Sequence, residues 1–153
     1  MSRPDSYSHP DFAGIASTAS FPQGRSNSSP AERLILREDA ARIQFSRDLR
    51  RKLFKRNIFG EPAWDILLTL YVIDSDRRRL STGDLCKLAG LPLTTGLRWL
   101  DCLDEDGLIK RLPSTLDQRI VHVELTDNGR TALDDYFRRV REAAVFGPIA
   151  SGR

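Results

Sequence analysis

Apolar side chains recur with helical spacing from Ala31 to about Asn57, a stretch without Gly or Pro in which Ala, Leu, Arg and Glu dominate. This composition favours a helix. At about 100° per residue, one apolar stripe along it comprises Leu34, Ala41, Phe45 and Leu49. A second stripe, on nearly the opposite side, comprises Leu36, Ile43 and Phe54. Two opposed apolar stripes predict a helix that contacts both its own domain and something else.

A second helix is predicted to start at Pro62, after the break at Gly60, and to end at Asp74. Proline costs little at the first helical position, because its missing N–H would have no partner there. The helix is apolar nearly all round, with one face formed by Trp64, Leu67, Leu68 and Tyr71 and another by Ile66, Leu70 and Ile73. Such a helix is expected to lie at the centre of the domain.

Two short helices follow, one within 80–91 and one from the turn Gly90-Leu91-Pro92 to about Asp106. Ser81 or Thr82 is the expected N-cap of the first, and Gly107 is expected to end the second in the left-handed conformation. The residues expected to face inward are Leu85, Leu88, Ala89, Gly96, Trp99, Leu100 and Leu103. Two short helices joined by a tight Gly-containing turn are typical of a helix-turn-helix.

A β-hairpin is predicted directly after this motif. Leu108 to Leu112 forms one strand, 113–118 is a polar turn, and Arg119 to Leu125 alternates with Val121, Val123 and Leu125 on one face. A hairpin in this place is a wing. A last helix begins at the cap Thr126-Asp127, and its apolar stripe comprises Leu133, Tyr136, Phe137, Val140 and Ala144.

These elements predict a mainly α fold with a small β-hairpin wing (α+β), a winged helix-turn-helix with long N-terminal and C-terminal helices. The expected divisions are a disordered tail at 1–30, the N-terminal helix region at 31–59, the winged helix-turn-helix domain at 60–126, the C-terminal helix at 127–146 and a frayed tail at 147–153. The N-terminal tail is rich in Ser, Pro and Gly and cannot bury enough apolar surface to offset its ordering entropy. A loose docking through Phe12, Ile15 and Phe21 is the alternative.

Composition narrows the class of protein. With 153 residues, 40% hydrophobic and 29% charged, the chain matches one soluble domain. Its longest apolar stretch, Ile66 to Ile73, is far too short to span a membrane, and the N-terminus lacks the continuous apolar region of a signal peptide. Two cysteines exclude a disulfide-rich scaffold. A reducing, cytoplasmic location is therefore expected.

The formal net charge of +3 hints at an acidic partner. The segment 31–57 has nine Lys and Arg residues against four Asp and Glu residues. The plain interpretation of this excess is a solvated basic face between the two packing stripes.

The sequence offers little for catalysis. It contains no set of nucleophile and base, no Gly-rich phosphate loop and no paired carboxylates, so an enzyme is not expected. No cofactor is expected either, and no metal site, because His9, His122, Cys86 and Cys102 lack the spacing of a zinc site. Cys86 and Cys102 are interpreted as small, partly buried residues of a reducing cell, with a redox switch between them as the alternative.

The chemistry that remains is binding to nucleic acid. A helix fits the major groove of B-DNA, and a two-stranded ribbon can reach the adjacent backbone or minor groove. The outward residues near the start of the second motif helix are Leu93, Thr94, Thr95, Leu97 and Arg98. The hydroxyls and Arg98 can reach bases or phosphates, whereas the leucines offer only apolar contact, for instance to a thymine methyl. Asp101, Asp104, Glu105 and Asp106 would repel DNA at the other end.

These residues resemble the MarR family of bacterial winged-helix regulators over about 62–133. The most specific piece is Asp117-x-Arg119 followed by Leu125-Thr126, which is similar to the wing signature of the family, and Asn128-Gly129-Arg130 is also typical. The stretches Leu88-Ala89-Gly90-Leu91 and Asp106-Gly107-Leu108-Ile109 match the same pattern.

The resemblance implies an obligate homodimer on a near-palindromic operator. It places Arg119 in the minor groove, with Asp117 steadying the loop, and it makes the first and last helices the dimer interface. The implied dimerisation residues are Leu34, Phe45, Leu49, Leu133, Phe137 and Val140. The full set of candidate DNA-binding residues is Ser81, Thr82, Leu93, Thr94, Thr95, Leu97, Arg98, Asp117, Gln118 and Arg119. The alternative for Arg98 is that it is a solvated residue of the helix. The alternative for Arg119 is that it only pairs with Asp117 in the wing.

The sequence departs from the family in three ways. Leu93 and Leu97 stand where family members usually have polar residues, and Gly96 stands where a larger apolar residue is usual. One helix follows the wing, where the family generally has two. This difference weakens what the resemblance implies about the geometry of the dimer and about the family's pocket for small aromatic effectors. We therefore predict a homodimeric, sequence-specific double-stranded DNA-binding transcriptional regulator. The alternative is a protein-interaction or adaptor module that has lost base reading, suggested by the apolar Leu93 and Leu97.

Overall fold

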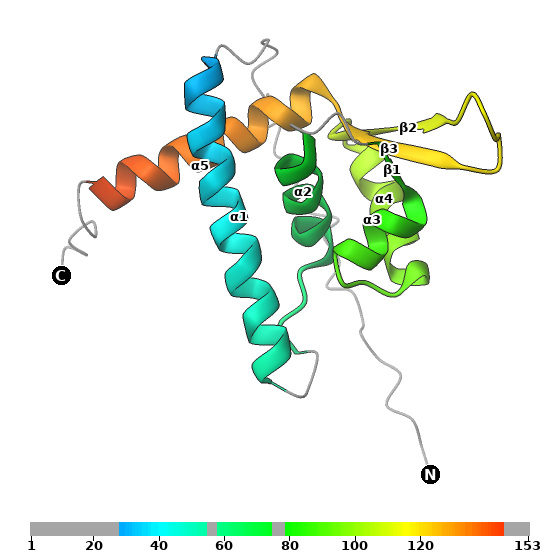
Figure 1. Ribbon diagram of the computed structural model, residues 1–153, viewed down its shortest axis with the longest axis horizontal. Helices are drawn as coiled ribbons and strands as arrows, with labels where there is room; N and C mark the ends of the chain where they lie inside the picture. Colours follow the sequence, from blue (N-terminus) through cyan, green and yellow to red (C-terminus); the bar gives the residue numbers. More distant parts are fainter. Residues whose placement is uncertain (1–27, 55–57, 75–78, 146–153) are drawn as a thin grey trace, which may run out of the picture.

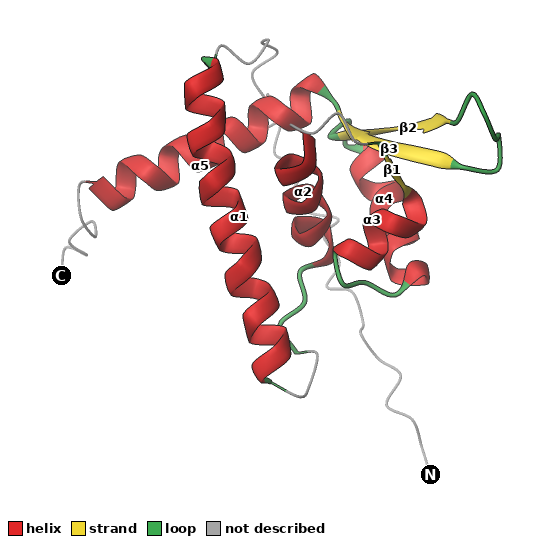
Figure 2. Cartoon of the chain, in the orientation of Figure 1, coloured by secondary structure: helices red, strands yellow, loops and turns green. Residues whose placement is uncertain are grey.

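The computed structural model describes residues 28–54, 58–74 and 79–145. Along the chain, its helices and strands are α1 (Pro30–Leu53), α2 (Pro62–Ile73), β1 (Leu80–Ser81), α3 (Thr82–Leu88), α4 (Leu93–Glu105), β2 (Ile109–Pro113), β3 (Val121–Leu125) and α5 (Asp127–Val145). Helices predominate, and the strands form one small sheet (Figure 2). This confirms the predicted mainly α fold with a β-hairpin wing.

Helix α1 begins where the sequence supplies a cap and a proline. The Ser29 hydroxyl accepts a hydrogen bond from the backbone N–H of Glu32, and Pro30 occupies the first turn. One side of α1 is buried through Leu36 and Ala40. The opposite stripe, which includes Phe45, is exposed in the single chain. Both predicted stripes therefore exist, except that Phe54 lies beyond the helix and is exposed.

Helix α2 lies at the centre, between α1 and the pair α3 and α4 (Figure 1). Nearly all its apolar residues are buried or packed against the core, as the sequence predicts. Its aromatic rings meet those of α5: the ring centroids of Tyr71 and Phe137 are 5.3 Å apart, and those of Trp64 and Tyr136 are 4.8 Å apart. The core therefore joins the first, second and last helices to the motif that follows α2.

The sheet is antiparallel with the strand order β1-β3-β2. Strand β3 pairs with β2 from Ile109 opposite Leu125 to Pro113 opposite Val121. Val123 and Leu125 are buried, as the alternating pattern predicts. The sequence analysis missed β1, because a strand of two residues has no periodicity of its own and exists only through its pairing with β3. The hairpin projects beyond the helices (Figure 1).

Helix α5 starts at the predicted cap, where the Thr126 hydroxyl accepts from the backbone N–H of Gly129 at 3.0 Å. On its buried side, Asp134 accepts hydrogen bonds from the hydroxyls of Tyr71 and Ser28. Burial first, and then the bond to Asp134, raises the pKa of Tyr71, which stays a protonated donor. Ser28 is thereby fixed to α5, so the predicted disorder of 1–30 is wrong for its last residues.

Residues 1–27 and 146–153 lie outside the described residues. The predictions made for them, which are the remainder of the disordered N-terminal tail, its docking alternative and the frayed C-terminal end, therefore stay predictions. Within the described part of the chain, no helix is both long enough and apolar enough to cross a membrane.

Candidate nucleic-acid interface

The helix-turn-helix is closed by backbone hydrogen bonds and one left-handed glycine. Leu91 N–H donates to the Cys86 carbonyl at 2.9 Å, and Gly90 has a φ of +69°, a conformation that favours glycine. Ser81 caps α3 by accepting from the backbone N–H of Asp84. Leu85 and Ala89 face the core, but Leu88 is 52% exposed and does not. It lies at the C-terminal end of α3, on the side of α1.

Helices α3 and α4 touch at Gly96. A Cβ atom added to this glycine would lie 2.2 Å from Cys86 Sγ, far inside van der Waals contact. A glycine at position 96, where a larger apolar residue is usual in the family, therefore has a local explanation. The buried Cys86 side chain occupies the space that a larger residue would need. Contact with Cys86, together with the buried Leu100 and Leu103, sets which side of α4 faces away from the domain.

The outward side of α4 carries the predicted recognition residues. Leu93, Thr94, Leu97 and Arg98 are exposed, and Thr95 is half-buried. The first turn, Leu93-Thr94-Thr95-Gly96, is uncharged, and the N-cap Pro92 has no side-chain group that could accept from its N–H groups. Such a helix start favours a phosphate group.

The acidic end of α4 is partly neutralised within the chain. Arg111 of β2 donates to Asp101 at 2.7 Å and to Asp104 at 3.0 Å. The hydrogen bond with Asp101, followed by that with Asp104, raises the pKa of Arg111 above its ordinary value. The N-terminal half of α4 is therefore the half suited to approach a polyanion.

The loop of the wing is held by side-chain-to-backbone hydrogen bonds. The Ser114 hydroxyl accepts from the N–H groups of Leu116 and Asp117, and the Asp117 carboxylate accepts from the N–H of Arg119 at 3.0 Å. This last bond is a loop-steadying contact of the kind that the resemblance implies for Asp117. The side chains of Gln118 and Arg119 are exposed, and Leu116 is 96% exposed at the same loop.

Two candidate DNA-binding residues have other tasks in the chain. The Ser81 hydroxyl donates to the Asp84 carboxylate at 2.7 Å while it caps α3. The Thr82 hydroxyl donates to the Val121 carbonyl at 3.2 Å and links α3 to β3. Both hydroxyl hydrogens are used internally, so these residues serve as structural contacts of the motif in this conformation.

The predicted dimerisation residues fall into two groups. Leu34, Phe45 and Leu49 of α1 and Val140 of α5 are exposed. Leu133 and Phe137 are buried in the core of the single chain, Phe137 completely, so their prediction as dimer contacts is wrong. Their part of the α5 stripe packs on α2 instead, and the exposed apolar residues that neighbour it in sequence are Tyr136 and Val140. Ile35 and Leu53 of α1 are further exposed apolar residues that the sequence analysis did not include.

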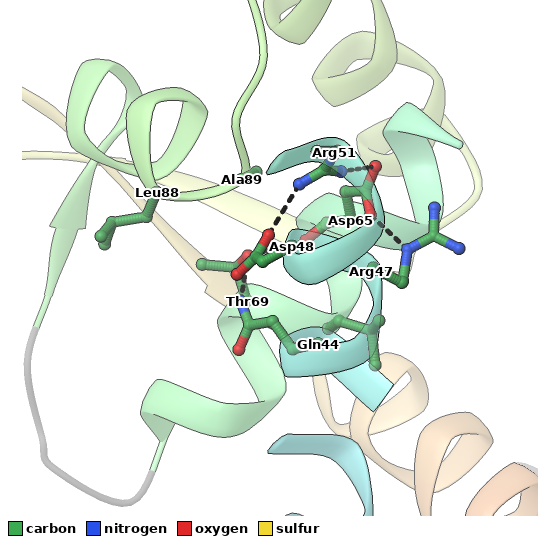
Figure 3. Close-up of a pocket in the computed structure, with 9 residues that line it drawn as sticks. Gln44, Arg47, Asp48, Arg51, Asp65, Thr69, Leu88 and Ala89 are labelled. Atoms are coloured by element: carbon green, nitrogen blue, oxygen red, sulfur yellow. Dashed lines mark hydrogen bonds and ion pairs between the residues drawn. The ribbon is translucent and has the colours of Figure 1, made fainter. Parts of the chain in front are cut away.

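The predicted basic face of α1 is not uniformly solvated. Arg47 is buried, donates from Nε to Asp65 at 2.6 Å and pairs with Glu61. Arg51 pairs with Asp65 and with Asp48 (Figure 3). The pocket beside these groups is lined by Gln44, Arg47, Asp48, Arg51, Asp65, Leu68, Thr69, Leu88 and Ala89. We call Arg47, Arg51, Glu61 and Asp65 the ion cluster. It fixes α1 to α2 beside the turn of the helix-turn-helix.

The two cysteines have different surroundings. Cys86 is buried against Gly96, and burial raises the pKa of its thiol, which disfavours the reactive thiolate. Cys102 is exposed on α4. The contact with Gly96 supports the plain interpretation of Cys86 as a packing residue.

Comparison with known proteins shows what the chain is similar to in sequence and in structure. No family model matches the chain. The HTH-type transcriptional repressor YetL of Bacillus subtilis is 32% identical over 77 residues, a match that covers 50% of this chain and 45% of the repressor. The chain therefore matches about half the length of that curated relative.

Two solved structures are also similar to the chain. The transcriptional regulator PA4135 is 22% identical with a TM-score of 0.42, covering 78% of this chain and 85% of that one. A point mutant of MepR from S. aureus is 20% identical with a TM-score of 0.47, covering 78% and 84%. The curated relative is described as a transcriptional repressor, and PA4135 is described as a transcriptional regulator. With its helix-turn-helix and wing, the chain is a winged helix-turn-helix protein that resembles the MarR family of transcriptional regulators.

Proposed function

We propose that the chain is a homodimeric, sequence-specific regulator of transcription that binds double-stranded DNA. The observation that carries the proposal is the exposed N-terminal half of α4 in a helix-turn-helix that is followed by a hydrogen-bonded wing. Thr94 and Arg98 offer a hydroxyl and a guanidinium there, while the acids lie at the other end of the helix. This half of α4 would enter the major groove, and Arg119 of the wing would enter the minor groove.

A second copy of this chain is the partner that we propose for the exposed stripe of α1. Leu34, Phe45 and Leu49 form this dimer stripe, opposite the buried Leu36 and Ala40. Exposed apolar stripes of this kind mark protein contacts. A two-fold dimer would present two copies of α4 to half-sites about one helical turn apart.

The proposal is tested by selecting duplexes from a random library with the purified chain at near-physiological salt. We expect a palindromic sequence to be enriched. The logarithm of the binding constant should then fall with the logarithm of salt concentration by about 0.9 for each neutralised phosphate. An affinity that does not depend on salt would contradict DNA binding through Arg and Lys.

Arg119→Ala should lower affinity for the selected duplex by about tenfold, the effect of losing one charged minor-groove contact worth about 1.4 kcal/mol. The melting temperature should stay the same, because the Asp117 carboxylate bonds the Arg119 backbone N–H, which alanine retains. Fluorescence anisotropy with labelled duplex measures the change. Arg33→Ala is the matched control, since Arg33 is an exposed residue of α1 outside the dimer stripe. Equal affinities of the two variants would refute the role of Arg119.

Phe45→Glu should convert the dimer into a folded monomer, because it places a charge in the centre of the dimer stripe. Phe45 is 68% exposed in the single chain, so the fold itself should tolerate the change. Light scattering after size exclusion gives the mass, and circular dichroism reports the fold. Leu116→Glu makes the same kind of change on the wing and should leave the dimer intact. A Phe45→Glu protein that stays dimeric would place the interface elsewhere.

A further inference from the structure

We infer that Leu93 and Leu97 read the C5-methyl groups of thymine in the major groove, so that methyl groups set part of the base preference of each half-site. The inference rests on the proposed function and deepens it, because it names the chemical group that the two leucines recognise. Both residues are exposed apolar side chains on the half of α4 that is proposed to enter the major groove.

The two leucines are placed to act together. Leu93 is 52% exposed and Leu97 is 40% exposed. They are four residues apart on α4 and are therefore neighbours on one side of the helix. Gly96 lies against Cys86, and Leu100 is buried, so α4 is fixed in rotation and cannot turn the leucines inward. The N-terminal half of α4 thus presents a fixed apolar edge.

The surroundings of this edge favour DNA over a protein partner. Thr94 and Arg98 are exposed on the same half of α4 and interrupt the apolar surface. A protein contact usually needs a larger continuous apolar patch. The N–H groups of the uncharged first turn of α4 receive no side-chain cap, which favours a phosphate. The thymine methyl is the apolar group that base pairs display in the major groove. Two leucines flanked by a guanidinium, a hydroxyl and a phosphate-binding helix start therefore match a methyl group between phosphates.

This recognition predicts how single groups on the bases change affinity. Leucine cannot make hydrogen bonds, so it distinguishes thymine from uracil only by the methyl group. Replacing thymine by deoxyuridine at the contacted positions should weaken binding by about fourfold for each methyl removed, the effect of exposing one buried methylene-sized group. A 5-methylcytosine at the same position should bind more tightly than cytosine.

The experiment uses the full chain and the palindromic duplex recovered by selection. Duplexes with deoxyuridine at single thymine positions are compared with the parent duplex by fluorescence anisotropy. We expect at least one position in each half-site to show the loss with the unchanged chain. Leu93→Ala with Leu97→Ala should bind the parent duplex more weakly and should no longer distinguish thymine from deoxyuridine. Thermal melting of the variants confirms that they are folded.

Leu88→Ala is the matched control. Leu88 is 52% exposed, as Leu93 is, but it lies on α3 on the side of α1. The Leu88→Ala chain should keep the ratio of affinities for thymine and deoxyuridine.

The outcomes separate the inference from the proposed function. Failure to enrich any duplex would overturn the proposed function and the inference with it. A selected duplex bound equally well with thymine or deoxyuridine at every position would overturn the inference alone. Parent-level affinity of the double leucine variant for the selected duplex would also overturn the inference alone.

Discussion

Replacing Asp65 with alanine should lower the free energy of unfolding by about 3–5 kcal/mol, the cost of leaving a buried partner charge without compensation. Asp65 is buried in α2 and accepts from Arg47 Nε at 2.6 Å, and it also pairs with Arg51. Arg47 is itself buried in α1. Without the carboxylate, the exposed Glu61 would be the one acidic partner left to its guanidinium among the described residues.

Two further variants show whether charge or packing carries this effect. Arg47→Met together with Asp65→Leu replaces the buried pair with apolar side chains and should recover most of the lost stability, because such replacements are often neutral or stabilising. Arg111→Ala breaks the exposed pairs with Asp101 and Asp104 and should cost no more than about 1 kcal/mol. Urea unfolding followed by circular dichroism measures all of them. A loss below about 1 kcal/mol for Asp65→Ala would show that water solvates Arg47.

The ion cluster also explains where sequence reasoning fails on α1. The helix is correctly predicted, because its composition, its cap and its apolar spacing are local features. The burial of Arg47 is not local, since its partners Asp65 and Glu61 are 18 and 14 residues away on the next helix and at its start. In the sequence, Arg47 is one of nine Lys and Arg residues of 31–57 and has no property that separates it from the others. Only the packing of α1 against α2 in the structure distinguishes Arg47 from the others.

The same limit applies to the candidate site. The spacing that predicts α4 also predicts which of its residues face outward, and the structure leaves Thr94, Leu97 and Arg98 exposed. The stripe of α5 is correctly predicted as apolar, but it does not say which members face the chain's own core. Leu133 and Phe137 pack inward, while Tyr136 and Val140 remain exposed. A wide apolar stripe on a helix at the edge of a domain can pack partly against the domain's own core and remain partly exposed. The sequence does not show which residues of the stripe belong to each side.

Replacing Gly129 with alanine should lower the free energy of unfolding by about 3 kcal/mol, at the upper end of the range for overpacking. An added Cβ would lie 2.0 Å from the Leu108 carbonyl oxygen, a backbone atom that cannot rotate away. That carbonyl already accepts from Thr126 N–H at 3.1 Å, so the start of α5 is bonded to the residue that follows Gly107. The clash would separate α5 from the end of α4, and the higher helix propensity of alanine, about 1 kcal/mol, would offset only part of the cost.

Thermal unfolding should therefore show a melting temperature lower by about 10 °C for Gly129→Ala, from the usual relation between stability and melting temperature at this size. Gly83→Ala is the matched control, because a Cβ at Gly83 in α3 meets no atom of the described chain within 4 Å. That variant should be as stable as the parent or slightly more stable, since alanine favours the helix. Equal melting temperatures for the two variants would mean that the contact between α5 and Leu108 is loose in solution. A selective loss at Gly129 would show that the start of α5 is held against Leu108 at the end of α4, the joint through which the proposed dimer would position α4 on DNA.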